Sequence, residues 1–164
     1  VATALFGDGA AACVLTTGRS GFVRVRGAAE HSWPDTLDIM GWRIDETGLG
    51  VIFDRAIPPF ARDHLRPAVD DILQAQGLRL SDIDHLICHP GGTKVIQSIE
   101  TALSLNDGAL VHERAVLRDH GNMSAPTVLF VLERARRQGL KGLSLLTALG
   151  PGFTLSTVTL EADQ

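Results

Sequence analysis

The stretch Ile87-Cys88-His89-Pro90-Gly91-Gly92-Thr93-Lys94 combines an apolar strand, a histidine and a glycine-rich turn that leads into a helix. Proline and two glycines end the strand directly after His89 and leave backbone with little steric bulk beside it. A side chain of a type common in catalysis, His89, is therefore predicted at the C-terminal end of a strand. A second such junction occurs at Gly121-Asn122-Met123-Ser124, where Asn122 precedes a predicted helix. We expect the fold to bring His89 and Asn122 together.

The pattern of apolar residues around these two junctions predicts an α/β domain with strands and helices in layers. Apolar spacings of three to five predict helices at 58–77, 94–105 and 124–138, with a kink or break in the first at Pro67. Short strands are predicted at 22–26, 51–53 and 85–89, and 31–50 is interpreted as a loop with short strands. Segments 143–149 and 153–160 are predicted to form a hairpin around Gly150-Pro151-Gly152.

Length and composition indicate one globular domain, or one half of a larger two-part fold. The chain has 164 residues, of which 45% are hydrophobic and 21% charged, and its net charge is −4. That charge argues against a nucleic-acid or acidic-membrane partner. The local basic cluster Arg134, Arg136, Arg137 and Lys141 is interpreted as a solvated helix C-terminus. No apolar run reaches the roughly 18 residues that a transmembrane helix needs, and no signal peptide is recognised.

The two cysteines favour a reducing compartment. Cys13 and Cys88 each lie inside an apolar run, which predicts buried thiols rather than a disulfide framework. A cytoplasmic location is therefore expected. Cys88 is not expected to act as a nucleophile with His89, because adjacent residues of a strand point to opposite faces.

Two other site motifs are rejected on geometry. Gly7-Asp8-Gly9-Ala10-Ala11-Ala12 fits a loose dinucleotide fingerprint, but 10–17 is too short for the crossover helix that such a site requires. His85 and His89 would share one face on a helix and could then bind zinc. On the predicted strand they are about 13 Å apart, too far for one ion. We therefore expect no metal site.

His89 and Asn122 together suggest an oxyanion hole. Either alone has an ordinary structural explanation: a lone histidine is often structural, and an asparagine at this position can cap a helix. Two N–H donors that converge beside glycines can instead bind a thioester carbonyl as it gains negative charge. The positive end of the helix after Asn122 would act in the same direction.

Four motifs in order give this chain a specific resemblance. Leu5-Phe6-Gly7-Asp8-Gly9-Ala10-Ala11, His89-Pro90-Gly91-Gly92, Gly121-Asn122-Met123-Ser124 and Gly150-Pro151-Gly152 resemble the C-terminal half of a type III polyketide synthase of the chalcone synthase family. The resemblance covers residues 1–164 and implies half of a thiolase-like fold, a mixed sheet layered with helices. It also implies an N-terminal half that is absent from this chain, and a homodimer.

The resemblance also implies site residues. His89 and Asn122 would belong to a Cys-His-Asn triad, whose nucleophilic cysteine lies in the absent half. His89 would pair with that cysteine as imidazolium and thiolate. The substrates would be malonyl-CoA and an acyl-CoA starter, with no other cofactor. Substrate-binding positions matched to the family are Phe6, Val51, Gly91, Gly92, Ser124, Gly150 and Pro151.

Two positions depart from the plant members of the family. Gly48-Leu49-Gly50-Val51 has valine where they carry a second gatekeeping phenylalanine, and Leu149 replaces the phenylalanine of a Gly-Phe-Gly-Pro-Gly loop. Smaller side chains leave more cavity volume. The segment 40–53 is similar to bacterial members that make alkylpyrones or alkylresorcinols, so we expect a long aliphatic starter.

Two rival functions are also compatible with the sequence. A ketoacyl synthase of the initiating type, which uses a carrier protein, shares the fold but typically has Gln-Ala-Asn after its histidine. His89-Pro90-Gly91-Gly92 favours the polyketide synthase. A non-catalytic thiolase-like module is the other alternative, and the retention of both His89 and Asn122 argues against it.

Overall fold

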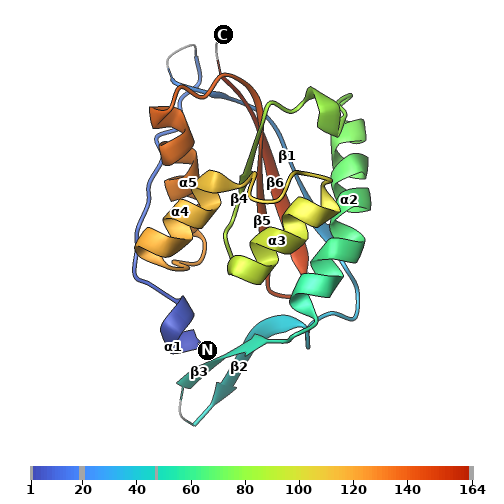
Figure 1. Ribbon diagram of the computed structural model, residues 1–164, viewed down its shortest axis with the longest axis vertical. Coiled ribbons are helices and arrows are strands. Elements are labelled where there is room, and N and C mark those ends of the chain that lie inside the picture. The colour runs from blue at the N-terminus through green and yellow to red at the C-terminus, as the bar shows by residue number, and fades with distance from the viewer. Residues whose placement is uncertain (1, 19–20, 47, 163–164) are drawn as a thin grey trace.

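A four-stranded mixed sheet forms the centre of the computed structural model, which describes residues 2–18, 21–46 and 48–162 (Figure 1). Its strand order is β1-β6-β5-β4; β4 and β5 are parallel, and the other two pairs are antiparallel. This confirms the predicted mixed α/β fold. In chain order the elements are α1 (Ala2–Leu5), β1 (Arg24–Ser32), β2 (Met40–Asp45), β3 (Gly48–Phe53), α2 (Ile57–Ala75), the 3-10 turn η1 (Leu80–Asp82), β4 (His85–Cys88), α3 (Thr93–Ala102), α4 (Val111–His120), α5 (Pro126–Arg137), β5 (Gly142–Gly150) and β6 (Thr154–Ala162).

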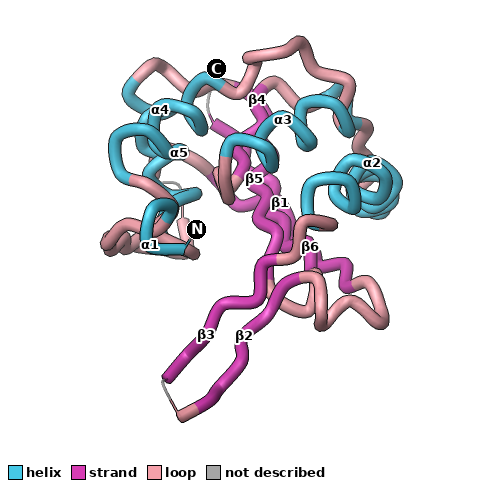
Figure 2. Tube along the Cα trace, turned by 60° about the horizontal axis from the view of Figure 1, so that its bottom comes forward, coloured by secondary structure: helices cyan, strands magenta, loops and turns pink. Residues whose placement is uncertain are grey.

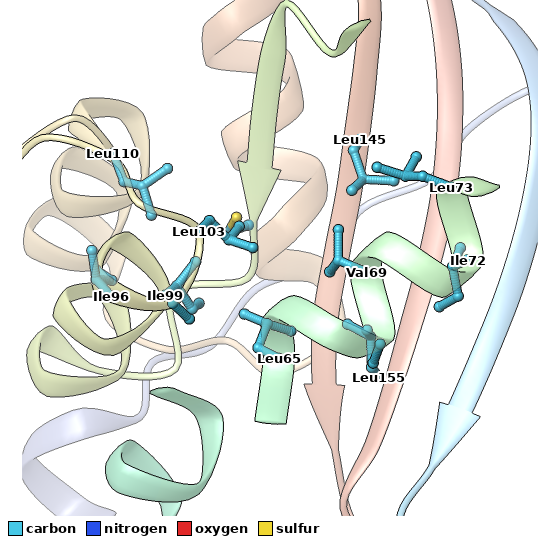
Figure 3. Packing of buried hydrophobic residues seen from close by; sticks show 13 residues of the cluster. Leu65, Val69, Ile72, Leu73, Ile96, Ile99, Leu103, Leu110, Leu145 and Leu155 are labelled. Carbon is cyan, nitrogen blue, oxygen red and sulfur yellow. The ribbon is translucent and has the colours of Figure 1, made fainter. Parts of the chain in front are cut away.

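Apolar side chains are buried on both faces of the sheet, because successive strand residues point to opposite sides. Cys88 and Leu145 belong to a cluster with helices α2 and α3, whereas the neighbouring Ile87 and Leu146 belong to a cluster with α4 and α5. Figure 3 shows the first cluster, to which α2 contributes Leu65, Val69, Ile72 and Leu73, helix α3 contributes Ile96 and Ile99, and the strands contribute Leu145 and Leu155. Helices therefore cover both faces, and β4 lies between them.

Pro67 was predicted to kink or split helix α2, and the helix runs as one element from Ile57 to Ala75, so the predicted split is wrong. Proline removes one backbone N–H and frees the carbonyl four residues earlier. Pro67 lies on the exposed side of the helix, where water can satisfy that carbonyl. The neighbouring Leu65, Ala68 and Val69 are buried, and their packing holds the helix together on the other side.

The segment predicted as a loop with short strands contains more regular structure than expected. Strands β2 and β3 form a hairpin that extends away from the rest of the molecule (Figure 2). The predicted hairpin around Gly150-Pro151-Gly152 is confirmed as β5 and β6. None of the helices within the described ranges has the length and apolar character that a bilayer crossing requires.

The remaining segments differ from the sequence analysis in two places. Helix α4 was not predicted, because four of its ten residues are charged and its apolar pattern is weak. Cys13 was expected to be buried but is exposed, and so are Val14 and Leu15 beside it. Residues 8–18 are exposed along their whole length and form neither helix nor strand. An apolar run is buried only where other elements cover it, and within the described chain no element covers this one.

Candidate active site

His89 is the first residue after β4, at the carboxyl end of two parallel strands. Its backbone N–H donates to Thr147 O of β5 at 2.8 Å, and its carbonyl accepts from Gly91 N at 3.0 Å. Helix α3 then begins at Thr93. Because parallel strands end at the same edge of a sheet, this is a common position for ligand-binding residues in α/β folds.

Burial lowers the pKa of His89 to about 4. Within this chain the imidazole is therefore neutral at pH 7, and a neutral imidazole offers one N–H donor and one acceptor nitrogen. An imidazolium at this position requires a neighbouring negative charge, such as a thiolate, to offset the desolvation.

Asn122 is buried, and both its backbone and its side chain are hydrogen-bonded. Its backbone N–H donates to Leu5 O at 2.9 Å, and its carbonyl accepts from Gly7 N at 3.0 Å. In the side chain, Oδ1 accepts from Ser124 N at 2.8 Å, and Nδ2 donates to Gly91 O at 3.3 Å. Because Ser124 N fixes the oxygen, the amide nitrogen is directed towards the loop that follows His89.

The two predicted catalytic loops therefore meet at Gly91. This glycine follows His89 by two residues and receives one of the two N–H groups of Asn122. The His89 ring also lies beside it, since a Cβ added to Gly91 would be 3.8 Å from His89 Cδ2. The structure thus brings His89, Gly91 and Asn122 into one site.

Phe6 joins the same site from the N-terminal segment. It forms an isolated parallel bridge with Asn122, and its ring lies 5.7 Å from the ring of Phe53 at the end of β3. Gly7 permits this close approach, because a Cβ there would lie 2.1 Å from the carbonyl oxygen of His120. Gly92 also faces this segment, with its nearest added-Cβ contact at Leu5 Cδ1.

Ser124 is exposed and adopts a positive φ of 62° in the turn before α5. The buried Thr127 closes this turn: its hydroxyl donates to Ser124 O at 2.6 Å and accepts from Met123 N at 2.9 Å. The Thr127 hydroxyl therefore fixes the backbone directly after Asn122.

Val51 lies in the β2–β3 hairpin, and Gly150 and Pro151 lie where β5 turns into β6. Val51 is opposite Trp42 in the β2–β3 hairpin, and Gly150 is opposite Thr154 at the end of β5. The turn after Gly150 reaches the hairpin, because Gly152 N donates to Met40 O at 2.9 Å. In the described chain no hydrogen bond or ring contact joins these three residues to His89.

A pocket of about 430 Å³ adjoins this region on the side of α1, α3 and α4. Its lining includes Leu5, Thr93, Arg114 and Gly121, but neither His89 nor Asn122. The pocket therefore lies next to the candidate site and is not lined by either candidate catalytic residue.

Sequence reasoning missed Glu113, a fully buried acid whose Oε1 accepts from Cys88 N at 2.8 Å. Burial raises the pKa of Glu113 to about 7. Burial also raises the pKa of the Cys88 thiol, and the Glu113 carboxylate adds to that effect. The signal for Glu113 was its spacing of three residues from Leu110 and from Val116, both of which are buried. That spacing places it on the core face of a helix.

Comparison with known proteins identifies the family of this chain. A family model described as chalcone and stilbene synthases, C-terminal domain, matches residues 24–162. The 1,3,6,8-tetrahydroxynaphthalene synthase of Streptomyces peucetius subsp. caesius is 41% identical over 98% of this chain and 45% of its own length. A 3,5-dihydroxyphenylacetyl-CoA synthase of Amycolatopsis balhimycina is 35% identical with the same coverage of both chains.

Solved structures show the same relation. The 1,3,6,8-tetrahydroxynaphthalene synthase of Streptomyces coelicolor A3(2), a bacterial type III polyketide synthase, superposes with a TM-score of 0.81 and 28% identity, over 89% of this chain and 43% of that protein. The chain thus spans about half the length of the relatives it matches. With the family model covering β1 to β6, the chain belongs to the chalcone and stilbene synthase family and corresponds to its C-terminal domain.

Proposed function

We propose that this chain forms the C-terminal half of a type III polyketide synthase, which condenses malonyl-CoA onto an acyl-CoA starter with loss of carbon dioxide. The observation that carries the proposal is the hydrogen bond from Asn122 Nδ2 to Gly91 O, which joins the loop after His89 to the loop of Asn122. The four family motifs support the assignment of both residues to a Cys-His-Asn triad.

In this reaction His89 and Asn122 act as N–H donors to the thioester oxygen. Loss of carbon dioxide from the malonyl group leaves an enolate, and the negative charge on its oxygen is stabilised by donors that are already in place. Removing one donor of such a hole costs about 3 kcal/mol of barrier stabilisation. Asn122 is suited to this role because its side-chain orientation is fixed by Ser124 N.

The reactive cysteine belongs to an N-terminal half. Its thiolate would supply the negative charge that raises the pKa of His89 and permits an imidazolium–thiolate pair. We expect the isolated chain to form no polyketide, because it carries neither that cysteine nor the other half of the cavity. We further propose a homodimer in the cytoplasm that needs no cofactor beyond its CoA thioester substrates.

The hairpin favours an apolar starter. Across its strands Met40 lies opposite Phe53, Trp42 opposite Val51 and Ile44 opposite Leu49. Since residues two apart share a face of a strand, one face of the hairpin is entirely apolar, and its base meets Phe6. Such a face suits the long aliphatic starter that the valine at position 51 suggested.

A second product class has its own support. The two relatives above are named for 1,3,6,8-tetrahydroxynaphthalene and 3,5-dihydroxyphenylacetyl-CoA, and neither name includes a long alkyl chain. A small polyhydroxylated aromatic product is therefore the alternative. The carrier-dependent ketoacyl synthase is less well supported, because the matching family model is that of chalcone and stilbene synthases. The non-catalytic module is less well supported, because both His89 and Asn122 are present.

Mass spectrometry of reaction products tests these proposals. The longer protein, with this chain behind its N-terminal half, is given malonyl-CoA alone and with acyl-CoA starters of increasing length and with an aromatic starter. We expect pyrones or resorcinols that carry the starter chain, and their loss in His89→Ala and Asn122→Ala. A naphthalene-type product from malonyl-CoA alone would replace the long-starter proposal with the alternative. Intact malonyl-CoA with every starter would refute the condensation itself.

A further inference from the structure

Glu113 connects the two elements that carry His89 and Asn122. It lies in α4 with 1% of its surface exposed, and its Oε1 accepts a hydrogen bond from Cys88 N at 2.8 Å. Cys88 is the last residue of β4 and immediately precedes His89. Helix α4 ends at His120, two residues before Asn122. A single buried hydrogen bond therefore joins the strand that leads to His89 with the helix that leads to Asn122.

The geometry of the sheet explains why Cys88 offers this donor. Backbone N–H groups of successive strand residues point to opposite sides of the strand. The N–H of His89 is directed at Thr147 O of β5, so the N–H of Cys88 is directed away from β5. On that side β4 is the edge of the described sheet. Glu113 thus accepts from the N–H of Cys88 on one side of the strand, and Thr147 accepts from the N–H of His89 on the other.

A second buried acid provides a comparison. Glu100 in α3 is 2% exposed, accepts from Leu110 N at 3.0 Å and pairs with Arg114. It fixes the start of α4 against α3. Of these two acids, only Glu113 is hydrogen-bonded to β4. Glu113 therefore connects α4 to the strand that ends at His89, and Glu100 does not.

We propose that Glu113 is a positioning residue that sets the spacing between His89 and Asn122 by holding the end of β4 against α4. The proposal rests on the proposed function of these two residues. A helix of ten residues transmits a displacement at Glu113 to its C-terminus, beyond which Asn122 is hydrogen-bonded to Leu5 and Gly7. Loss of the Cys88 contact would therefore change the separation of the two N–H donors.

The charges around Glu113 make this contact sensitive to pH. Burial, assisted by Glu100, raises its pKa to about 7, while the Cys88 N–H and Arg114 act in the opposite direction. A carboxylate is a stronger acceptor than a neutral carboxyl group, so the contact is strongest above that pKa. A cavity of about 280 Å³ adjoins Glu113, and its lining includes Asp84, His85 and His112.

Heteronuclear NMR of the 164-residue chain tests the contact directly. We expect the Cys88 amide resonance to titrate with a midpoint near pH 7 in the unchanged protein, and this titration to vanish in Glu113→Gln, which keeps an acceptor oxygen but cannot ionise. We expect Glu113→Ala to shift the His89 amide and the Asn122 side-chain amide, whereas the control Glu100→Gln leaves both in place. A Cys88 titration that persists in Glu113→Gln would overturn the proposal, and so would unshifted His89 and Asn122 resonances in Glu113→Ala.

Kinetics of the longer protein provide the second readout. Because a small misplacement of catalytic groups costs on the order of tenfold to a hundredfold in rate, we expect Glu113→Ala to lower kcat by roughly tenfold or more with little change in KM. Glu113→Gln should restore most of kcat and remove the part of the pH profile that lies near pH 7. Equal losses in Glu113→Ala and Glu113→Gln would contradict a positioning role. If the longer protein condenses nothing, the proposed function fails, while the NMR result still decides whether Glu113 holds β4.

Discussion

Replacing Gly7 with alanine should detach the N-terminal segment from the loop of Asn122. The added Cβ would lie 2.1 Å from the carbonyl oxygen of His120, whereas Cβ atoms rarely come within 3.0 Å of such an atom, so the segment must retreat by about 0.9 Å. The hydrogen bonds Gly7 N to Asn122 O and Asn122 N to Leu5 O, at 3.0 and 2.9 Å, would then exceed 3.5 Å. Each bond contributes about 0.5–1.5 kcal/mol, so docking of this segment should weaken by about 1–3 kcal/mol.

Hydrogen exchange at single amides measures this loss. A weakening of 1–3 kcal/mol corresponds to exchange at Gly7 and Asn122 that is about five- to 150-fold faster. Gly50→Ala is the matched control, because its added Cβ meets the backbone only at 3.5 Å and should leave both amides protected. Unchanged protection of Gly7 and Asn122 in Gly7→Ala would refute the reasoning, since it would mean that the segment accommodates the methyl group without moving.

Thr127→Val should destabilise the chain by about 1–3 kcal/mol, because it leaves Met123 N buried without its acceptor, whereas Thr127→Ser should cost much less; urea unfolding that ranks the two variants equally would contradict this. Glu113→Gln should gain stability relative to the unchanged protein as pH rises. The folded-state pKa of Glu113 is raised from 4.5 to about 7, so ionisation costs about 3 kcal/mol of stability between these values, and urea titrations at acid and alkaline pH should show that difference widen. A constant difference would refute it. Val51→Phe in the longer protein should shift products towards shorter starters, because a ring occupies space at the proposed gate; an unchanged product distribution by mass spectrometry would exclude Val51 from that role.

Local patterns in the sequence were sufficient for much of the fold. Helices α2, α3 and α5 and the β5–β6 hairpin follow from apolar spacing and turn residues, which act within one element. The junctions of His89 and Asn122 could be recognised for the same reason. His89 lies between a strand and a helix, and Asn122 lies between a glycine and a helix. Helix α4 could not be recognised this way, since its charged residues weaken the apolar pattern while its burial comes from contacts with other elements.

The tertiary structure decided which of these residues lie together. The sequence alone could not show that Asn122 donates to Gly91, that Phe6 reaches Asn122, or that Glu113 holds Cys88. It also predicted a kink or split at Pro67 and a buried Cys13, but the helix is not split and Cys13 is exposed. The physical reason is the same in each case. Periodicity describes which face of one element is apolar, whereas burial, hydrogen-bond partners and the cost of a proline depend on what the rest of the chain places against that face.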